Sequence, residues 1–551
     1  MILGLDMGGT HTDAVILDGK KVINTVKILT RDDLLSSILE AIEKVCQNID
    51  INNVKRLVLS TTLTTNAVVQ DKLVRAGLIA QTGPGIPKEL IKINQDTHFV
   101  SGYVDHRGEV ISEVSEQEIQ SIKEHFQTNN IKYAGIVSKF SVRNAECENH
   151  IAEKLNNTLL FASLGHQVSG MLNFPRRMNT AYLNASVYEI HKKFIDSVKS
   201  ALGQMQINAP VYMLKADGGT IKINESLNVP AQTITSGPSA SIMGILGLVK
   251  NEECIIALDI GGTTTDIAII HKGAPLLEPE GITLGKYKTL IRALYTRSIG
   301  VGGDSKVFHD DEKIVIGPER QGQPYCMNGQ GLTPTDAVRY LGLSEYGDES
   351  LAKIIIEKFA QDNSIGEKQA AEEIIDAVVN QIVDEVNEML ADLNTRPVYT
   401  IHEIIEGKDI KPTTVAVIGG PANIFGPKIA EKLNCKLSIP ENVRVANAIG
   451  AAIARTTTEI TVHSDTSAGY VKCIEEDLSE RVSQDYNLTS AKEFAEKCLL
   501  ERIKRLGADE ENIETEITEA QSFNMVRGFY TAGKNIRVKA QVKPGVIKEF
   551  K

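Results

Sequence analysis

The sequence lacks the cysteine and histidine patterns that build disulfide frameworks and zinc sites. Its seven cysteines are odd in number and form no CxxC pair, which excludes a disulfide-stapled scaffold and a zinc ribbon. Its eleven histidines form no HxH or HExxH pair, so no dedicated transition-metal site is expected. A chain of this length can form a hydrophobic core large enough to be stable without disulfides or structural metal ions.

Long apolar runs and an excess of basic residues are also missing. No apolar run reaches ~18 residues, the length that spans a bilayer. The first residues, MILGLDMGG, have no basic region, and Asp6 interrupts them, which excludes a signal peptide. The net charge of −12 argues against a nucleic-acid binder, which needs a basic face. These features predict a cytoplasmic protein with neither a nucleic-acid nor a membrane partner.

An internal repeat is the most informative feature that is present. Residues 6–16 read DMGGTHTDAVI and residues 259–269 read DIGGTTTDIAI, with seven of the eleven positions identical. Apolar and β-branched residues flank each copy on both sides, so each predicts a β-hairpin rather than a strand followed by a helix. The copies are too far apart for a solenoid repeat. They indicate two related α/β domains.

Each Asp-x-Gly-Gly-Thr turn has the composition of a phosphate-binding loop. Glycine lets the backbone approach a phosphate, and successive N–H groups can point at its oxygens. One such turn would suit an ordinary hairpin equally well, but two near-identical copies favour a clamp on a nucleotide triphosphate. The predicted phosphate-binding residues are Gly8, Gly9, Thr10, His11, Thr12, Gly261, Gly262, Thr263, Thr264 and Thr265.

Four aspartates in these turns are the candidate catalytic residues. Asp6 and Asp259 lead the two motifs, and a carboxylate there suits Mg²⁺ held between it and the phosphates through water. Asp13 and Asp266 end the motifs at equal spacing. Each either caps its own turn or acts as a base or metal-shell carboxylate. His11 either donates to a phosphate or is a solvated loop residue.

A third glycine turn is the candidate nucleoside site. Residues 417–423 read VIGGPAN, an apolar strand ending where backbone can lie against a flat base. The predicted contacts are Gly419, Gly420, Pro421 and Asn423. The chain has neither GxxxxGK[ST] nor GxGxxG, which excludes a P-loop and a Rossmann fingerprint.

Several helices are expected from apolar spacing. They cover residues 176–202, 366–392, about 426–433 and about 489–505. Residues 440–455 predict a closing strand and then a helix of small residues that packs closely. The character of the sequence changes near residue 456, and a small α+β appendage is expected from there on.

The three glycine turns in this order resemble the actin-like ATPase superfamily, and further motifs narrow the resemblance to the hydantoinase A/oxoprolinase family. Those motifs are STTLTTNAV (60–68), KFSVRNAECE (139–148), VSGMLNFPRRMNTAYLNA (168–185), MLKADGG (213–219), TSGPSAS (235–241), IGVGGDS (299–305), GPERQGQPYC (317–326) and LTPTDA (332–337). The resemblance covers about residues 1–455.

The resemblance implies an α/β fold of two ribonuclease-H-like, actin-like ATPase domains flanking a nucleotide cleft, followed by the appendage. The implied segments are 1–175, 176–455 and 456–551. It also implies ATP and Mg²⁺ as cofactors, and a further loop, Gly302, Gly303 and Asp304, near the transferred phosphate.

The implied activity is ATP-dependent opening of a small cyclic amide, such as a hydantoin or 5-oxoproline, through phosphorylation of the amide carbonyl. Family members often work with a separate B-type subunit, so that subunit or a homo-oligomer is an expected partner. Two alternatives stay open: a nucleotide switch that reactivates a partner enzyme, and a small-molecule kinase.

Overall fold

The computed structural model describes residues 1–31, 33–249, 252–310, 313–395, 410–509 and 513–547. Its helices and strands form a mixed α/β fold that divides into two compact units. The first unit comprises Met1–Ser239, Leu277–Ala293 and Ala451–Lys551, and the second comprises Ala240–Leu276 and Leu294–Gly450. The division at 175/176 and 455/456 follows chain order instead and stays a prediction.

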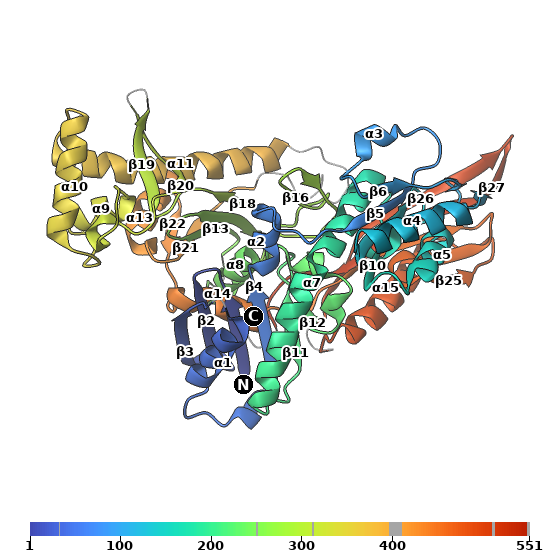
Figure 1. Cartoon of the computed structure of the whole chain (residues 1–551), viewed down its shortest axis with the longest axis horizontal. Coiled ribbons are helices and arrows are strands. Elements are labelled where there is room, and N and C mark those ends of the chain that lie inside the picture. The colour runs from blue at the N-terminus through green and yellow to red at the C-terminus, as the bar shows by residue number, and fades with distance from the viewer. Residues whose placement is uncertain (32, 250–251, 311–312, 396–409, 510–512, 548–551) are drawn as a thin grey trace. The chain divides into compact units, whose positions relative to one another are not determined.

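The first unit begins with a six-stranded sheet in the order β12-β11-β4-β1-β2-β3 (Figure 1). Strand β1 is antiparallel to β2 and parallel to β4. Helices α1 and α7 cover apolar strand residues such as Leu3, Leu5 and Leu57. The elements are β1 (Ile2–Met7), β2 (His11–Asp18), β3 (Lys21–Leu29), α1 (Leu34–Val45), β4 (Arg56–Thr61), α2 (Leu63–Val69), α7 (Phe174–Gln204), β11 (Val211–Leu214) and β12 (Thr220–Lys222).

A second sheet of the first unit is wholly parallel, in the order β10-β9-β5-β6. Buried residues of α4 and α5, among them Phe126 and Ile151, pack on it. The elements are β5 (Gly77–Gln81), α3 (Lys88–Ile91), β6 (Thr97–Phe99), β7 (Tyr103–Val104), β8 (Val110–Ser112), α4 (Glu116–Thr128), β9 (Tyr133–Ser138), α5 (Glu146–Leu155), β10 (Phe161–Leu164) and α6 (Gly165–Val168).

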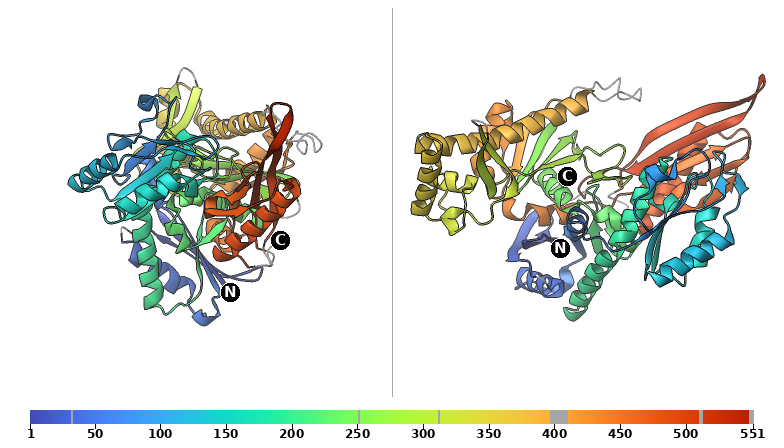
Figure 2. Two further views of the ribbon diagram at one scale, coloured as in Figure 1. Left: turned by 90° about the vertical axis from the view of Figure 1, so that its right-hand side faces the viewer. Right: turned by 45° about the horizontal axis from the view of Figure 1, so that its top comes forward.

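The C-terminal part of the first unit is a five-stranded antiparallel sheet with one helix on one face. The strand order is β25-β24-β23-β27-β26, and α15 packs against the alternating apolar residues of β23 and β27. The elements are β23 (Glu459–Asp465), β24 (Tyr470–Cys473), β25 (Leu478–Arg481), α15 (Leu488–Arg505), β26 (Thr515–Arg527) and β27 (Tyr530–Val542). Figure 2 shows β26 and β27 as a long red ribbon.

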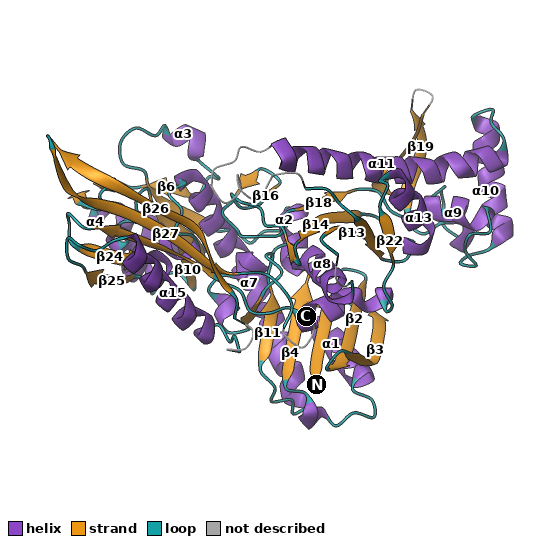
Figure 3. Ribbon diagram, turned by 180° about the vertical axis from the view of Figure 1, so that it is seen from behind, coloured by secondary structure: helices purple, strands orange, loops and turns teal. Residues whose placement is uncertain are grey.

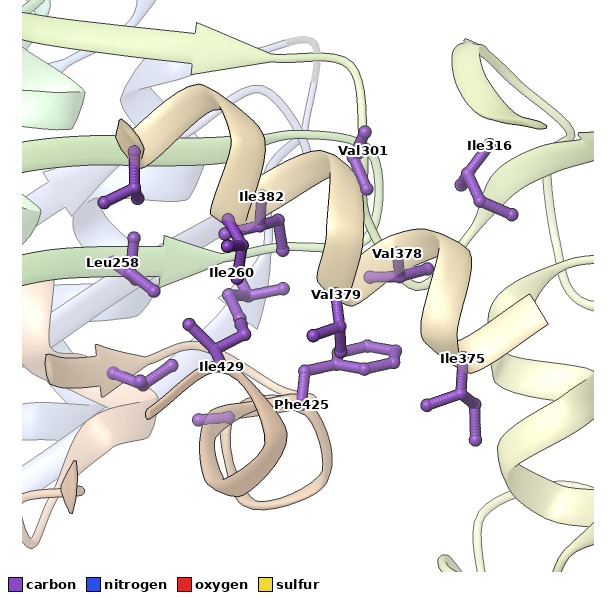
Figure 4. Packing of buried hydrophobic residues seen from close by; sticks show 14 of the residues in the cluster. Leu258, Ile260, Val301, Ile316, Ile375, Val378, Val379, Ile382, Phe425 and Ile429 are labelled. Carbon is purple, nitrogen blue, oxygen red and sulfur yellow. The ribbon is translucent and has the colours of Figure 1, made fainter. Parts of the chain in front are cut away.

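The second unit has a sheet ordered β15-β14-β13-β21-β22, with β18 also paired to β14. Helices α11 and α13 cover it, and Val379, Ile382 and Phe425 lie in its core with Leu258 and Ile260 (Figure 4). The elements are β13 (Cys254–Ile260), β14 (Thr265–His271), β15 (Ala274–Pro275), β18 (Thr296–Ile299), β19 (Ser305–Asp310), β20 (Lys313–Arg320), α9 (Pro334–Tyr340), α10 (Glu349–Asp362), α11 (Glu367–Thr395), β21 (Thr414–Ile418), α13 (Ala422–Lys432) and β22 (Lys436–Ser438). The short strands β16 (Thr283–Leu284) and β17 (Tyr287–Lys288) belong to the first unit.

Four predicted helices are confirmed as α7, α11, α13 and α15, but the strand expected within 440–455 is wrong. Val443 and Val445 alternate as in a strand, yet they form a short 3-10 turn. The preceding Asn442 has φ 63°, a left-handed conformation that ends an extended segment. Helix α14 (Ala446–Ile453) follows, and the helix α8 (Ser236–Leu248) lies against it. A Cβ on Gly450 would stand 1.9 Å from the Ala240 carbonyl oxygen, so the small residues do permit close packing.

Candidate functional site

The first repeat forms the predicted hairpin between β1 and β2. The Gly8 N–H donates to the His11 carbonyl across the turn at 2.9 Å. This bond closes the turn and leaves Gly9, Thr10 and His11 exposed. Partial burial and the charge of Lys27 lower the pKa of His11, which favours the neutral form of this ring.

The two aspartates of the first hairpin lie opposite each other. Asp6 pairs with Asp13 in the register of β1 and β2, so both side chains lie on one face. The Ser60 hydroxyl on β4 donates to Asp6. Lys27 on β3 is the register partner of Asp13, and its ammonium lies 3.0 Å from that carboxylate. The lysine therefore compensates one of two neighbouring negative charges.

The second repeat forms the same hairpin between β13 and β14. The Gly261 N–H donates to the Thr264 carbonyl at 2.9 Å, the bond seen in the first copy. Gly262 and Thr264 are exposed. Asp259 lies opposite Asp266 in the register, and the Ser241 hydroxyl donates to Asp259 Oδ2 at 2.6 Å. The two repeats therefore share one backbone design.

The residue opposite the last aspartate differs between the copies. In the second hairpin, Ser298 on β18 occupies the register position that Lys27 holds in the first. Removal from water and the charge of Asp259 raise the pKa of Asp266 to about 7, although a hydrogen bond from Ser298 opposes the rise. Asp266 is therefore a carboxyl group that can take or release a proton near neutral pH.

Two threonines of the motifs face inward. The Thr12 hydroxyl is buried and bonds to that of Thr30 at 3.0 Å. The buried Thr265 hydroxyl donates to the Val301 carbonyl at 2.7 Å. These side chains hold the hairpins in place, while Thr10 and Thr264 remain on the open side of the turns.

The loop of Gly302, Gly303 and Asp304 packs directly under the second hairpin. The Gly303 N–H donates to the Gly261 carbonyl at 3.0 Å, and that of Asp304 donates to the Gly262 carbonyl at 2.5 Å. A Cβ on Gly302 would stand 2.6 Å from the Gly261 oxygen, so only glycine permits this approach. Burial raises the pKa of Asp304, against the charge of Arg320. The loop positions the hairpin, and its contact with phosphate stays a prediction.

The third glycine turn also reaches the second hairpin. Gly419 follows β21, which lies parallel to β13, and has φ 97°. A Cβ there would stand 2.1 Å from the Ile260 carbonyl oxygen and 3.0 Å from Asp259 Oδ1. Gly420 and Asn423 are exposed and Pro421 is half-buried. The second unit therefore gathers Asp259, Asp266 and both additional loops at one end of its sheet.

Sequence analysis missed the residues that orient the leading aspartates. Ser60 holds Asp6, and Ser241 holds Asp259 while contacting Asn447 at 3.0 Å. Both serines lie within quoted motifs, STTLTTNAV and TSGPSAS. A single sequence gives no sign that a serine far along the chain contacts a given carboxylate.

Three other polar or reactive residues within the quoted motifs have structural partners. Arg176 pairs with Glu280 at 2.8 Å. The wholly buried Arg177 donates to the carbonyls of residues 138, 139 and 171. Cys326 is buried, and burial with the neighbouring Asp336 raises its pKa to about 12, as expected for an unreactive thiol.

Comparison with known proteins decides the family. The model of the hydantoinase/oxoprolinase family matches residues 177–460, just over half of the 551 residues. The model of the hydantoinase/oxoprolinase N-terminal region matches residues 2–159. The chain belongs to the hydantoinase/oxoprolinase family. The resemblance seen in the sequence motifs is thus confirmed.

Relatives within this family are distant in sequence. The caprolactamase subunit alpha of Pseudomonas jessenii is 22% identical over 79% of this chain and 67% of its own length. The 5-oxoprolinase of Saccharomyces cerevisiae is 24% identical over 62% of this chain, but that match covers only 31% of the yeast protein. The crystal structure of the ATP-dependent caprolactamase from P. jessenii covers 99% of this chain and 88% of its own, with TM-score 0.78 and 17% identity. The fold of this hydantoinase/oxoprolinase chain is therefore that of the caprolactamase structure.

Two features typical of other classes of protein are absent from the described residues. Among the described residues, no helix combines the length and the apolar character needed to cross a bilayer. Within the same residues, no group of three or more His, Cys, Asp or Glu side chains is placed to hold a metal ion.

Proposed function

We propose that this chain is an ATP-dependent hydrolase that opens a small cyclic amide of the hydantoin or 5-oxoproline type by phosphorylating the amide carbonyl. The main support for this proposal is the pair of matching Asp-x-Gly-Gly-Thr hairpins in a chain of the hydantoinase/oxoprolinase family. Caprolactamase and 5-oxoprolinase, two relatives of the chain, are named for cyclic amides. The caprolactamase structure is described as ATP-dependent.

Both turns fit a polyphosphate. Gly9, Thr10 and His11 in the first, with Gly262 and Thr264 in the second, are exposed around turns that backbone hydrogen bonds already close. Such pre-formed turns bind phosphate oxygens through N–H and hydroxyl donors without reorganising. Gly420 and Asn423 then remain open for the nucleoside.

Each hairpin lies in the same local strand arrangement. β1 has an antiparallel neighbour in β2 and a parallel one in β4, and β13 has the same neighbours in β14 and β21. This repetition supports the predicted pair of ribonuclease-H-like, actin-like ATPase domains. That Asp6 and Asp259 bind Mg²⁺ remains a prediction, and the oxygen ligands present fit that ion. When bound, Mg²⁺ would offset the charge of the transferred phosphate.

The chain's own residues supply positioning and proton transfer. The amide oxygen bonds to the γ-phosphorus and ADP leaves, which turns a poor electrophile into a reactive one. Water then adds at the amide carbon, and the ring C–N bond breaks as the nitrogen gains a proton, which leaves an acyl phosphate. A second water attacks the carbonyl carbon of the acyl phosphate, and inorganic phosphate leaves with the oxygen of the original amide. We expect Asp266, whose pKa is raised to about 7, to accept a proton from the attacking group. Ser241 fixes the neighbouring Asp259.

A further protein partner is part of the proposal. The matched caprolactamase chain is named as a subunit, so a B-type second subunit or a homo-oligomer is expected to complete the hydrolytic step. The turns that we propose to bind ATP lie on the present chain. We therefore expect substrate-dependent ATP cleavage to require this chain, and ring opening to respond to the added subunit.

The test is a panel of lactams and hydantoins incubated with the chain, ATP and Mg²⁺, with products identified by mass spectrometry. Ring-opened product and ¹⁸O passing from a labelled amide carbonyl into inorganic phosphate are the expected results. A stable phosphorylated product would instead indicate a kinase. ATP cleavage that rises only with a partner protein, with no small molecule consumed, would indicate a nucleotide switch.

A further inference from the structure

Helix α2 (Leu63–Val69) is fixed beside the turn of the first hairpin. It follows β4 directly (Figure 3). The N–H of Thr62, the residue that caps the start of α2, donates to the carbonyl of Met7, the last residue of β1, at 3.2 Å. The Thr65 hydroxyl of α2 accepts a hydrogen bond from the N–H of Thr235 at 2.8 Å. These bonds lie within the first unit and hold α2 at the end of β1, where the turn begins.

Asn66 places a carboxamide group of α2 against this turn. A Cβ on Gly9 would stand 3.6 Å from Asn66 Nδ2, which is ordinary van der Waals contact. Gly9, Thr10 and His11 are exposed, and Asn66 is partly exposed. A small molecule bound at the exposed turn would therefore be within reach of the Asn66 side chain.

The Asn66 carboxamide has hydrogen-bonding capacity to spare. Its Nδ2 donates to the Thr62 hydroxyl at 3.4 Å, which uses one of two N–H groups. Within the part of the chain that the structure describes, its Oδ1 accepts no hydrogen bond. One donor and one acceptor of the same planar group are therefore available to a ligand at the turn.

The corresponding side chain at the second hairpin is an acid. Gly262 holds the place of Gly9 in the second repeat, and a Cβ there would stand 2.5 Å from Asp304 Oδ2. An ionised carboxylate accepts hydrogen bonds but donates none. The second turn therefore lacks, at this position, the donor that Asn66 supplies to the first.

A cyclic amide presents a donor and an acceptor along one edge. A small ring holds the N–H and the carbonyl of its amide cis to each other, whereas in an open-chain secondary amide the cis form is about 70-fold rarer than the trans form. A carboxamide side chain has the complementary edge, with an N–H beside an oxygen. The two groups can therefore join through two hydrogen bonds at once, which an open-chain amide in its trans form cannot do.

We propose that Asn66 binds the amide edge of the cyclic substrate at the first turn, with Nδ2 donating to the ring carbonyl and Oδ1 accepting from the ring N–H. This inference rests on the proposed function. The contact holds the carbonyl oxygen at the turn that we propose to bind phosphate. It also makes Asn66 a residue that selects cyclic amides over open-chain ones.

The same contact assists the transfer of phosphate. When the amide oxygen bonds to the γ-phosphorus, the bond between that phosphorus and the leaving oxygen of ADP breaks, and the ring nitrogen keeps its proton. Positive charge then develops on the nitrogen, so its N–H becomes a stronger donor to Oδ1. An interaction that strengthens towards the transition state raises the rate as well as the affinity. We therefore expect Asn66 to affect kcat/KM for the amide more than the affinity for ATP.

The test measures ADP formation by the full chain with ATP, Mg²⁺ and two pairs of cyclic amides: 5-oxoproline with N-methyl-5-oxoproline, and hydantoin with 3-methylhydantoin. Methylation removes the N–H that Oδ1 accepts. Two neutral hydrogen bonds correspond to roughly 5–150-fold in affinity, so Asn66→Ala should lower kcat/KM for the unmethylated compound at least tenfold. The wild type should prefer the unmethylated member of the pair that it consumes, and the variant should lose most of that preference.

Two further variants serve as controls. Asn66→Leu keeps the approximate size of the side chain, forms helix more readily than asparagine and makes no hydrogen bond, so it should show the same loss and gives the answer if the alanine variant does not fold. Gln70→Ala removes an exposed carboxamide that directly follows α2, and it should leave both kcat/KM and the preference unchanged.

The affinity for ATP, measured by calorimetric titration without an amide, should be the same in the wild type and in Asn66→Ala. If the variant loses affinity for ATP but keeps the preference for the unmethylated compound, Asn66 contacts the nucleotide and the proposal is wrong. Unchanged kcat/KM for an amide that the wild type consumes would also overturn it, and would leave the proposed function intact. If no cyclic amide stimulates ADP formation by the wild type, the proposed function fails and this inference fails with it.

Discussion

Replacing Asp266 by asparagine separates its proposed chemistry from its effect on stability. The side chain keeps its size, and its amide oxygen can still accept the hydrogen bond from Ser298, but it can no longer accept a proton. A positioned general base contributes typically 10²–10⁴-fold to a rate. We therefore expect Asp266→Asn to lower ATP turnover more than tenfold, measured as phosphate release with the best lactam of the panel. Turnover close to that of the wild type would remove the catalytic role.

The same substitution should stabilise the nucleotide-free protein at alkaline pH. The pKa of Asp266 is raised to about 7 in the folded chain, whereas an unfolded aspartate titrates near ~3.9. Between these values the folded state binds more protons, so stability falls as pH rises. Below pH ~4 both states are protonated and the loss disappears. Asparagine does not ionise, so Asp266→Asn avoids this loss of stability.

The size of the gain follows from the pKa difference. Three pKa units correspond to an upper limit of about 4 kcal/mol. Because the side chain is only half-buried, solvent screening reduces this to about 1–2 kcal/mol. The Tm of Asp266→Asn should therefore exceed that of the wild type by a few degrees at pH 8 and match it at pH 4, measured by differential scanning fluorimetry.

Asp13→Asn is the matched control. It occupies the same place in the first hairpin, but Lys27 lies 3.0 Å from its carboxylate. Removing that charge leaves the lysine beside a neutral group, so this variant should lose stability at pH 8. Equal Tm shifts in the two variants would refute the argument that the residue opposite each aspartate sets its behaviour.

Three further results are expected. Ser298→Lys should place an ammonium opposite Asp266, which shifts the acid limb of the turnover–pH profile down by at least about one pH unit and lowers turnover at the optimum pH. If the acid limb does not shift, position 298 does not control the pKa of the Asp266 carboxyl group. Gly419→Ala adds a Cβ 2.1 Å from a backbone oxygen at φ 97°, so denaturant unfolding should show a loss of about 2 kcal/mol or more, whereas Gly420→Ala, with nothing within 4 Å, should be nearly neutral. Removing Mg²⁺ with EDTA should weaken ATP binding in calorimetric titrations at least tenfold, and unchanged affinity would count against the predicted magnesium at Asp6.

The sequence alone determined the features that are local in the chain. The two repeats each contain the strands, turn and register of their hairpin, because alternating apolar residues and paired glycines act over about ten residues. The helices α7, α11, α13 and α15 follow likewise from apolar spacing within one segment. Where local signals conflicted, as at Val443 and Val445, the prediction was wrong because the left-handed Asn442 turns the chain.

Only the tertiary structure decided which distant residues meet. Ser60 reaches Asp6 and Ser241 reaches Asp259, and the Gly302 loop supports Gly261, through strand pairings and helix packing that no local pattern encodes. The contrast between Lys27 and Ser298 likewise depends on which strand lies next to each hairpin. The residue on the neighbouring strand decides whether the aspartate faces a lysine, as Asp13 does, or has a raised pKa, as Asp266 does. Charge and burial act through space, so the sequence of the hairpin alone does not determine this difference.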